Sequence, residues 1–313
     1  MADIFGDLER FPPTRADAML CGPVVKGRAL IAGTISRLPL YAARGEEQLS
    51  QKEQPTFLYR SNTAMGPRLR LLLTMDDLLF YGDSLWAVER GAAGQIVDAY
   101  RVDRSRWYYD TNDGTTILLD GKDVDSRKII HFIGPQEGLL DIAGIEIRSY
   151  IDLLKVRAAR LRNPAPATRL VETQEQRYTP EELDILLDGY KTNHKADSDS
   201  VVHVPFGLNL EEGATQTVEM FDGQANQLAL AFAEKMSIEP ELIGGALDVS
   251  SIEYQNQQGK RSWFIDMNLA YWLDPILETL SKDNVVPKGQ SVRADLSGLV
   301  ALPQPENTEV RED

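Results

Sequence analysis

The stretch GLLDIAGIEIRSYIDLLKVRAARLRNPAP, residues 138–166, carries the longest helical pattern in the chain. Asp141 lies near its start, basic residues crowd its end, and Pro164 stops it, an order that the helix dipole and the proline ring favour. A helix over 139–163 has roughly 24 residues and spans about 36 Å. This length indicates a helix that crosses an assembly rather than one that lies inside a single core.

A small separate unit is predicted next, over residues 164–218. It begins with a strand near 169–172 and continues with a helix. The start of this helix is indicated by Thr179-Pro180-Glu181-Glu182, which supplies an N-cap residue, a proline at the first helical position and a glutamate at the third. A polar turn then leads to a strand at VVHVPF, 201–206.

Two more helices follow this unit. The first is predicted from about 222 to 236 and the second from about 257 to 280, where Pro275 is expected to kink it. Between them, the stretch at 244–256 contains glycine and serine residues that give a loop conformational freedom.

Two helices are also predicted in the first third of the chain. Residues 24–41 have small and aliphatic side chains on one face and end as a helix before Pro39. Residues 42–56 are charged and rich in glutamine, so we expect a loop there. The second helix runs from about 68 to 80, and its apolar residues recur at roughly helical spacing: Leu69, Leu72, Leu73, Leu79 and Phe80.

From Ser84 onward the hydrophobic pattern takes the period of strands. The sequence RGAAG and the later Asn112-Asp113-Gly114 are typical of hairpin turns, because their glycines permit positive φ. The predicted strands are 85–89, 95–102, 107–109, 115–119 and 128–133. We interpret this part as a compact antiparallel β-rich module.

Composition limits the classes of function. The 313 residues suffice for one large or two ordinary domains, and a hydrophobic content of 42% is ample for a core. The sequence has no apolar run of about 18 residues and no apolar leader near Met1, so a soluble protein made in the cytoplasm is expected. The net charge of −15 argues against a broad surface that grips phosphates.

Neither a metal nor a cofactor is expected. With Cys21 as the single cysteine and three histidines (His131, His194 and His203), the chain can form no internal disulfide and no Cys/His cluster. The sequence contains no glycine-rich phosphate loop and no Walker-type lysine.

The tetrapeptide Gly82-Asp83-Ser84-Leu85 matches the motif of a family of serine esterases. A serine hydroxyl needs a histidine to accept its proton, and that family carries it in an Asp-x-x-His motif near the chain end. No histidine follows residue 203, and the residues three positions before the three histidines are lysine or serine. We therefore interpret Gly82 as the turn that ends a helix, with Asp83 and Ser84 satisfying local backbone groups.

The remaining candidates for chemistry have plain structural interpretations. His131 is expected to be a packed, hydrogen-bonded histidine, and His194 an exposed one. The carboxylate pairs Asp76-Asp77 and Glu211-Glu212 are adjacent in sequence and make poor acid/base pairs. Four basic residues wrap the end of the first long helix, which favours a solvated or intersubunit helix end over direct DNA binding: Lys155, Arg157, Arg160 and Arg162.

Five stretches, in order, make the chain resemble the portal proteins of long-tailed bacteriophages. They show, in turn, a helix ending in Tyr-Gly before a strand, an Ile-x-His strand, a Gly-Leu start of a long helix, a helix ending in a turn, and a long helix with a proline. The stretches are YGDSLWAVERGAAGQIVDAYRVDRSRW (81–107), DSRKIIHFIGP (125–135), GLLDIAGIEIRSYIDLL (138–154), AFAEKMSIEPELIGG (231–245) and SIEYQNQQGKRSWFIDMNLAYWLDPIL (251–277).

The resemblance implies an α+β fold of a ring-forming subunit. Its parts would be an N-terminal arm (1–23), a β-rich wing (24–138), a first stem helix (139–163), a small α/β clip (164–218), a second stem helix (219–243), a tunnel loop (244–256), a long kinked helix that returns to the wing (257–300) and a disordered acidic tail (301–313). The tunnel loop would face the DNA channel with Gly244, Gly245, Asp248, Ser250, Ser251, Tyr254 and Gln255.

The family's function is mechanical, so no catalytic residue is implied. A portal is a homo-oligomeric ring, usually a dodecamer, at one vertex of the capsid in the virion, and it is assembled in the host cytoplasm. It nucleates the procapsid with the major capsid protein, docks the terminase large subunit for DNA packaging, and then seats the head-to-tail adaptor for DNA ejection. Double-stranded DNA would pass through it non-specifically, and no membrane is involved.

The sequence departs from the family pattern at the end of the first stem helix and at Ile238-Glu239-Pro240, and it is too short after the last helix for a large crown. Two other classes remain as alternatives: another phage ring, connector or shell protein, and a serine hydrolase that uses Ser84.

Overall fold

The computed structural model describes residues 12–162, 168–172, 179, 181–185, 187–188, 208–212, 218–244 and 264–300. The chain divides into two compact units. Unit 1 combines Met1–Leu153 with Gln224–Asp313, and unit 2 is Leu154–Gly223. Both helices and strands occur in each unit, as expected for an α+β fold.

A three-stranded antiparallel sheet lies at the centre of unit 1, in the order β4-β3-β8. Its strands are β3 (Asp83–Arg90), β4 (Ile96–Val102) and β8 (Ile129–Ile133), so the predicted hairpin and the strand at 128–133 are confirmed. Because side chains alternate along a strand, Trp86 and Phe132 face the main core while Leu85 and Ile129 face a second, smaller one.

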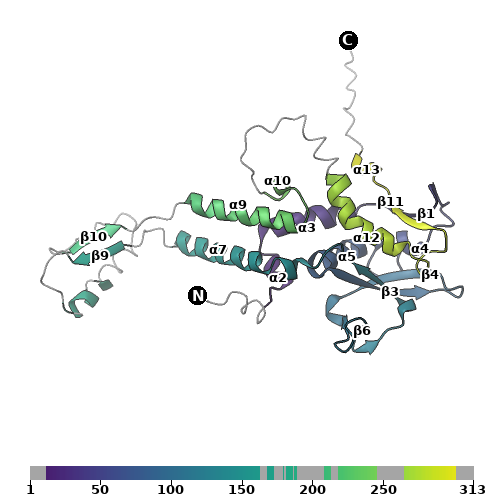
Figure 1. Cartoon of the computed structure of the whole chain (residues 1–313), viewed down its shortest axis with the longest axis horizontal. Coiled ribbons are helices and arrows are strands. Elements are labelled where there is room, and N and C mark those ends of the chain that lie inside the picture. The colour runs from purple at the N-terminus through teal and green to yellow at the C-terminus, as the bar shows by residue number, and fades with distance from the viewer. Residues whose placement is uncertain are drawn as a thin grey trace, which may run out of the picture. The chain divides into compact units, whose positions relative to one another are not determined.

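The smaller core is closed by a second sheet, β5-β6-β7. It consists of β5 (Trp107–Tyr109), β6 (Ile117–Leu119) and β7 (Lys122–Asp123), and the predicted turn at Asn112-Asp113-Gly114 joins the first two strands. Figure 1 shows β6 on one side of β3 and β4 and the helices α5 and α12 on the other. Trp107 fills the space between the two sheets.

Helices cover the other face of the central sheet. The elements are α2 (Arg15–Ala18), α3 (Gly22–Ile35), α4 (Thr56–Tyr59), α5 (Pro67–Tyr81) and α12 (Ala270–Leu280), with α13 (Ser297–Val300) at the end of the described chain. Both predicted helices of the first third are confirmed in α3 and α5. α3 packs along α5, and α5 packs against β3.

The buried face of α5 differs from the predicted apolar stripe. Leu79 and Phe80 are buried, but Leu69 is exposed, and Arg70 and Asp77 are buried instead. Arg70 donates to the backbone carbonyls of Phe57 and Ala99, and its guanidinium lies 4.4 Å from the Trp86 ring centre. These polar side chains tolerate burial because partners on other elements satisfy them, which sequence periodicity does not reveal.

A third sheet joins the two ends of the described chain in the order β11-β1-β2. It consists of β1 (Leu40–Arg44), β2 (Glu47–Gln48) and β11 (Ser291–Ala294). The strands β1 and β2 overlap residues 42–56, where we expected a loop, so that prediction is wrong for this part. The reason is the pairing of Ala42 with Val292, a partner far away in sequence.

The predicted continuous helix over 139–163 is broken in two. α6 (Leu139–Ile142) ends at Ala143, whose φ of −120° and ψ of 22° are not helical, and α7 (Gly144–Arg162) follows with 19 residues, about 28 Å. On the two sides of the break, Leu139 of α6 and Ile147 of α7 are both buried in the main core, and α6 packs against α5. Gly144 makes the break inexpensive because glycine is a poor helix former.

The second long helix is α9 (Val218–Lys235), which confirms the helix expected from 222 to 236, and α10 (Pro240–Ile243) follows it. Within unit 1, Tyr150 of α7 and Phe232 of α9 make an edge-to-face contact with ring centres 6.2 Å apart. The third helix is described from Phe264, where six residues of π-helix lead into α12 with Pro275 inside it.

Unit 2 contains an antiparallel pair, β9 (Thr168–Glu172) and β10 (Leu208–Glu212), and helical residues at 181–185 and 187–188. The predicted N-cap is present, because Thr179 N donates to Glu182 Oε2 at 2.9 Å and Glu182 N donates to Thr179 Oγ1 at 3.4 Å. The predicted strand at 201–206, His194, His203 and the tail at 301–313 lie outside the described residues.

Candidate functional site

Ser84 is not placed for nucleophilic catalysis. Its side chain is 0% exposed, and Oγ donates to Asp77 Oδ2 at 2.8 Å. Ser84 pairs with Phe132 in the sheet, whereas His131 pairs with Leu85, so the hydroxyl and the imidazole lie on opposite faces. A substrate could reach neither a buried hydroxyl nor a base across the sheet, which excludes the hydrolase interpretation.

At the joint between α5 and β3, the expectation for Gly82 is confirmed, whereas the one for Asp83 and Ser84 is not. Gly82 ends α5 with φ 81°, a left-handed conformation that glycine adopts without strain. The expected role of Asp83 and Ser84 in satisfying local backbone groups is wrong. Asp83 Oδ2 accepts instead from Tyr109 Oη at 2.7 Å, so side chains from other strands fix the joint.

His131 belongs to a small polar cluster on the face of the sheet that carries Leu85. Its Nε2 lies 3.1 Å from Tyr109 Oη and 3.6 Å from Asp83 Oδ2, and Arg104 Nε lies 3.5 Å from Asp83 Oδ1. Burial and the hydrogen bond to the Asp83 carboxylate raise the pKa of Tyr109. The expectation of a packed, hydrogen-bonded histidine is confirmed.

The adjacent carboxylates Asp76 and Asp77 each form ion pairs with arginines from other parts of the chain. Asp76 accepts from Arg28 Nε at 2.7 Å and from Arg15 at 2.9 Å, and Asp77 accepts from Arg101 Nε at 2.7 Å. They line a cavity of about 520 Å³ whose aspartate and arginine side chains largely pair with one another, so it offers no single unbalanced charge to a ligand.

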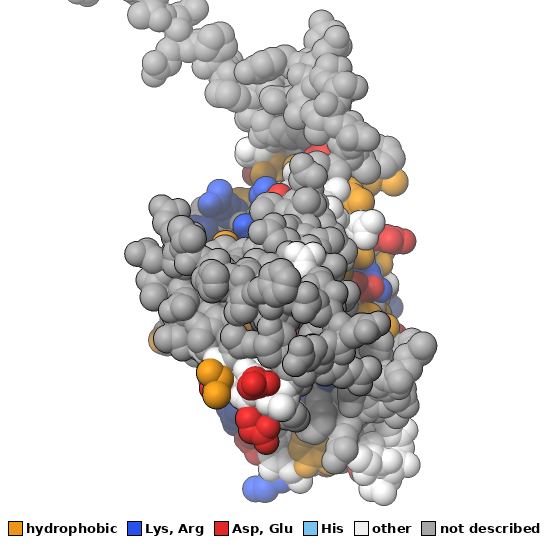
Figure 2. All heavy atoms as spheres, turned by 90° about the vertical axis from the view of Figure 1, so that its left-hand side faces the viewer, with side chains coloured by type: hydrophobic (Ala, Val, Ile, Leu, Met, Phe, Trp, Pro, Cys, Tyr) orange, Lys and Arg blue, Asp and Glu red, His pale blue; other side chains and the backbone are white. Residues whose placement is uncertain are grey.

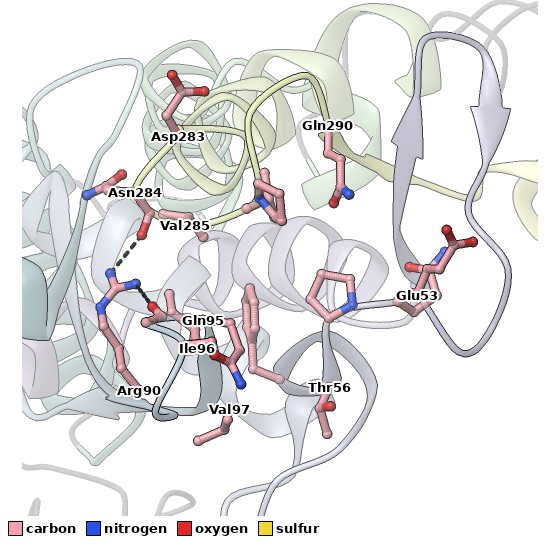
Figure 3. Close-up of a pocket in the computed structure, with 17 residues that line it drawn as sticks. Glu53, Thr56, Arg90, Gln95, Ile96, Val97, Asp283, Asn284, Val285 and Gln290 are labelled. Carbon is pink, nitrogen blue, oxygen red and sulfur yellow. Dashed lines mark hydrogen bonds between the residues drawn. The ribbon is translucent and has the colours of Figure 1, made fainter.

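A second cavity, of about 420 Å³, lies where the β3–β4 hairpin approaches the chain before β11 (Figure 3). Its one arginine, Arg90, already donates from each nitrogen to a backbone carbonyl, those of Arg127, Gly94 and Asn284 at 2.7–2.8 Å. Arg90 therefore holds three segments together rather than presenting a free anion site.

Chemistry based on a thiol or a metal has no support among the described residues. Burial raises the pKa of the Cys21 thiol to about 12, which keeps it protonated. Where the chain is described, no three His, Cys, Asp or Glu side chains gather in a way that could hold a metal ion. Over the same ranges, no helix is both long and apolar enough to cross a membrane.

Three side chains donate hydrogen bonds to backbone carbonyls at the end of α9. The last carbonyls of a helix lack partners within the helix. Here Gln136 Nε2 donates to Lys235 O at 2.6 Å, Trp272 Nε1 donates to Met236 O at 3.0 Å, and Asn268 Nδ2 donates to Ser237 O. We call these three donors, on three carbonyls in a row, the α9 clamp.

Through Asn268 and Trp272, the α9 clamp joins the end of α9 to the chain that follows residue 264, so its parts lie on both sides of the segment 245–263 in the sequence. That segment leaves the described chain after Gly244, at the end of α10, and returns at Phe264, four residues before Asn268. Gly27 of α3 supports the clamp, because Met236 lies so close that a Cβ at this position would be 2.6 Å from its methyl carbon. Sequence analysis missed the clamp, since its donors are neutral side chains scattered along the chain.

The structure places the predicted site residues in two groups. Lys155, Arg157 and Arg162 lie exposed on α7 in unit 2, while only the backbone of Arg160 is described. Gly244 ends α10 with φ 94°. The other tunnel-loop candidates, Gly245, Asp248, Ser250, Ser251, Tyr254 and Gln255, lie outside the described residues.

The described residues thus show long helices, a clamped end of α9 and a buried Ser84. The family model described as "Phage portal protein" matches residues 24–310. The chain belongs to the phage portal protein family, a structural family of ring-forming proteins.

Solved structures agree with this assignment at the level of the fold. The crystal structure of an HK97 family phage portal protein from Corynebacterium diphtheriae is 23% identical with a TM-score of 0.74, and the match covers 93% of this chain and 99% of that one. A chain in the neck of a native gene transfer agent particle, computed with C12 symmetry, is 15% identical with a TM-score of 0.60, covering 91% and 85%. No curated protein matches the chain by sequence.

Proposed function

We propose that this chain forms the ring at the unique capsid vertex through which double-stranded DNA is packaged and ejected, and that the ring docks the terminase large subunit and then a head–tail adaptor. The observation that carries the proposal is the family match over residues 24–310, nearly the whole chain. The ring would contain about twelve copies, would contact the major capsid protein, and would assemble in the host cytoplasm before joining the virion.

The proposed parts follow the order of the elements. α7 and α9 would be stem helices, residues 164–218 the clip, and residues 244–256 the tunnel loop beside the DNA. The α9 clamp supports the last assignment, because a loop that contacts moving DNA needs firmly held ends, and Asn268 and Trp272 supply them on the returning helix. The net charge of −15 supports passage of DNA without lasting phosphate contacts.

Electron micrographs of the purified full chain test the ring. We expect flat discs with a central hole, whose rotational averages give the copy number. Monomers, open filaments or closed shells would contradict a portal.

The tunnel loop has its own test in particles assembled with the capsid and terminase proteins of the same phage. Replacing residues 246–256 with a glycine–serine linker should leave ring formation intact and reduce the DNA retained per particle, measured by nuclease-protected DNA. A linker of the same length in the exposed turn 92–94 is the control, and equal packaging by both variants would refute the loop assignment.

A further inference from the structure

Unit 2 lacks a core of its own among the side chains that the structure describes. In the ranges 154–159, 161–162, 181–185 and 187–188, every side chain described is exposed except Leu183, which is half-buried, and near the start of α9 Phe221 is half-buried as well. A unit of this size needs buried apolar surface to offset the entropy lost on folding. The side chains described in these ranges are therefore accessible to a partner.

The end of α7 shows where such surface is available. Ile147 and Tyr150 belong to an apolar stripe that packs in unit 1, and Leu154, Ala158 and Leu161 continue it at i, i+4 and i+7 spacing. In unit 2, Leu154 is 37% exposed and Leu161 is 75% exposed. The stripe is thus covered in its first half and uncovered in its second.

Residues 181–188 present a second uncovered surface with the opposite charge. Ile185 is 73% exposed and Leu187 is 39% exposed. This segment, EELDILLD, has four acidic residues and no basic one, whereas LKVRAARLR at 154–162 has four basic residues and no acidic one. Figure 2, which faces the left-hand side of Figure 1, shows hydrophobic side chains at the surface beside acidic ones.

A chain that exposes two surfaces of opposite charge can assemble into a cyclic ring. Each contact in a cyclic ring joins two different surfaces, one from each neighbouring copy, and therefore needs complementary rather than identical patches. Charge complementarity favours this pairing and disfavours two like-charged surfaces facing each other. Membership of a ring-forming family makes a second copy the occupant that fits the chain.

We propose that residues 154–162 of one copy pack against residues 181–188 of the neighbouring copy, so that these two exposed surfaces are buried between subunits. The inference rests on the proposed ring. The proposed pairing assigns the basic end of α7 to a contact with protein, and the arginines there then have little role in binding DNA.

A charge-exchange experiment on the full chain tests this pairing. Arg157→Glu with Arg162→Glu, and separately Glu181→Lys with Asp184→Lys, place like charges on both surfaces. Each pair should raise the protein concentration at half-assembly about tenfold or more, measured by mass photometry. All four changes together restore opposite charges at every contact and should return the half-assembly concentration to near the wild-type value.

Two measurements make the outcomes distinct. Thermal unfolding of unit 1 should be unchanged in all variants, since the four side chains are exposed. In the wild type, amide hydrogen exchange of 154–162 and 181–188 should be fast in monomers and slow in rings.

If the wild type forms no ring, the proposed function fails. If it forms rings that all variants match, or if the arginine pair reduces only retained DNA, the pairing is refuted while the ring stands.

Discussion

The joint of Gly82, Asp83 and Ser84 depends on contacts of single atoms. Gly138 lies against it so closely that a Cβ at this position would be 2.4 Å from Phe80 O and 2.6 Å from Tyr81 Cα. Both neighbours are backbone atoms and cannot move aside as a side chain can. The approach of residues 80–82 to Gly138 thus fixes where α6 begins.

The close approach predicts a strong effect of Gly138→Ala. We expect the free energy of unfolding to fall by about 3 kcal/mol or more, because backbone has to shift to admit the methyl group. Gly66 is a matched control: it also begins a helix, its φ is likewise −63°, and no atom lies within 4 Å of its Cβ position. Gly66→Ala should cost less than about 1 kcal/mol in the same urea titration. Equal losses would contradict the steric argument.

Asp103 predicts a pH dependence of stability. Its carboxylate accepts from Ser105 Oγ at 2.7 Å and Ser105 N at 3.1 Å and pairs with Arg101, and these contacts lower the pKa of Asp103 to about 2. A lowered folded-state pKa stabilises the protein at pH values above the unfolded pKa, and this stability is lost as the pH falls towards the folded-state pKa.

The expected result for Asp103→Ala is a loss of roughly 0.5–1 kcal/mol at pH 7, small because the side chain is exposed. The difference from the wild type should shrink between about pH 4 and pH 2. Chemical denaturation at several pH values measures it. A difference that is the same at pH 7 and pH 3 would show that Asp103 acts through something other than its charge.

Among the elements, α3 offers a comparison between two glycines on one helix. Gly27 faces Met236 and Ile238, which are buried at the α9 end, whereas Gly33 has nothing within 4 Å of its Cβ position. Gly27→Ala should destabilise by about 1–3 kcal/mol through overpacking. Gly33→Ala should stabilise by up to about 1 kcal/mol, because alanine favours the helix.

The two glycine variants also report on the α9 clamp. If α3 holds the clamp, Gly27→Ala should speed amide hydrogen exchange at 236–244, while Gly33→Ala should not. Unchanged exchange in both variants would mean that α3 supports the core but not the clamp.

The elements that were predicted correctly are those with a local signal. RGAAG and Asn112-Asp113-Gly114 predicted hairpins, Thr179 predicted a helix start, and α3, α5 and α9 were found where helices were predicted, although the buried face of α5 differs from its apolar stripe. The elements that were missed depend on distant partners. β1 exists because β11 pairs with it, and the helix breaks at Ala143, where α6 packs against α5 before α7 begins.

The candidate site was predicted less well than the fold, for the same reason. The basic end of α7 was visible as a cluster in the sequence. The α9 clamp was not, because Gln136, Asn268 and Trp272 are unremarkable residues until the fold brings their donors to three consecutive carbonyls.

At the scale of the whole molecule, the charge of −15 predicts weak binding to free DNA. Double-stranded DNA should bind purified rings with a dissociation constant no tighter than the non-specific range of about 10⁻⁴–10⁻⁶ M at physiological salt, because few phosphates can be neutralised. Fluorescence anisotropy with a labelled duplex measures this. Tight binding that persists at high salt would contradict free passage of DNA.

The pairing of β1 with β11 has a consequence for synthesis. Leu40 cannot find Ala294 until about 250 further residues have left the ribosome, which takes roughly 12–50 s at 5–20 residues per second. Contacts of such long sequence separation form late and slowly. A nascent subunit thus carries an unfinished sheet, with β1 lacking its β11 partner, until residues 291–294 have emerged.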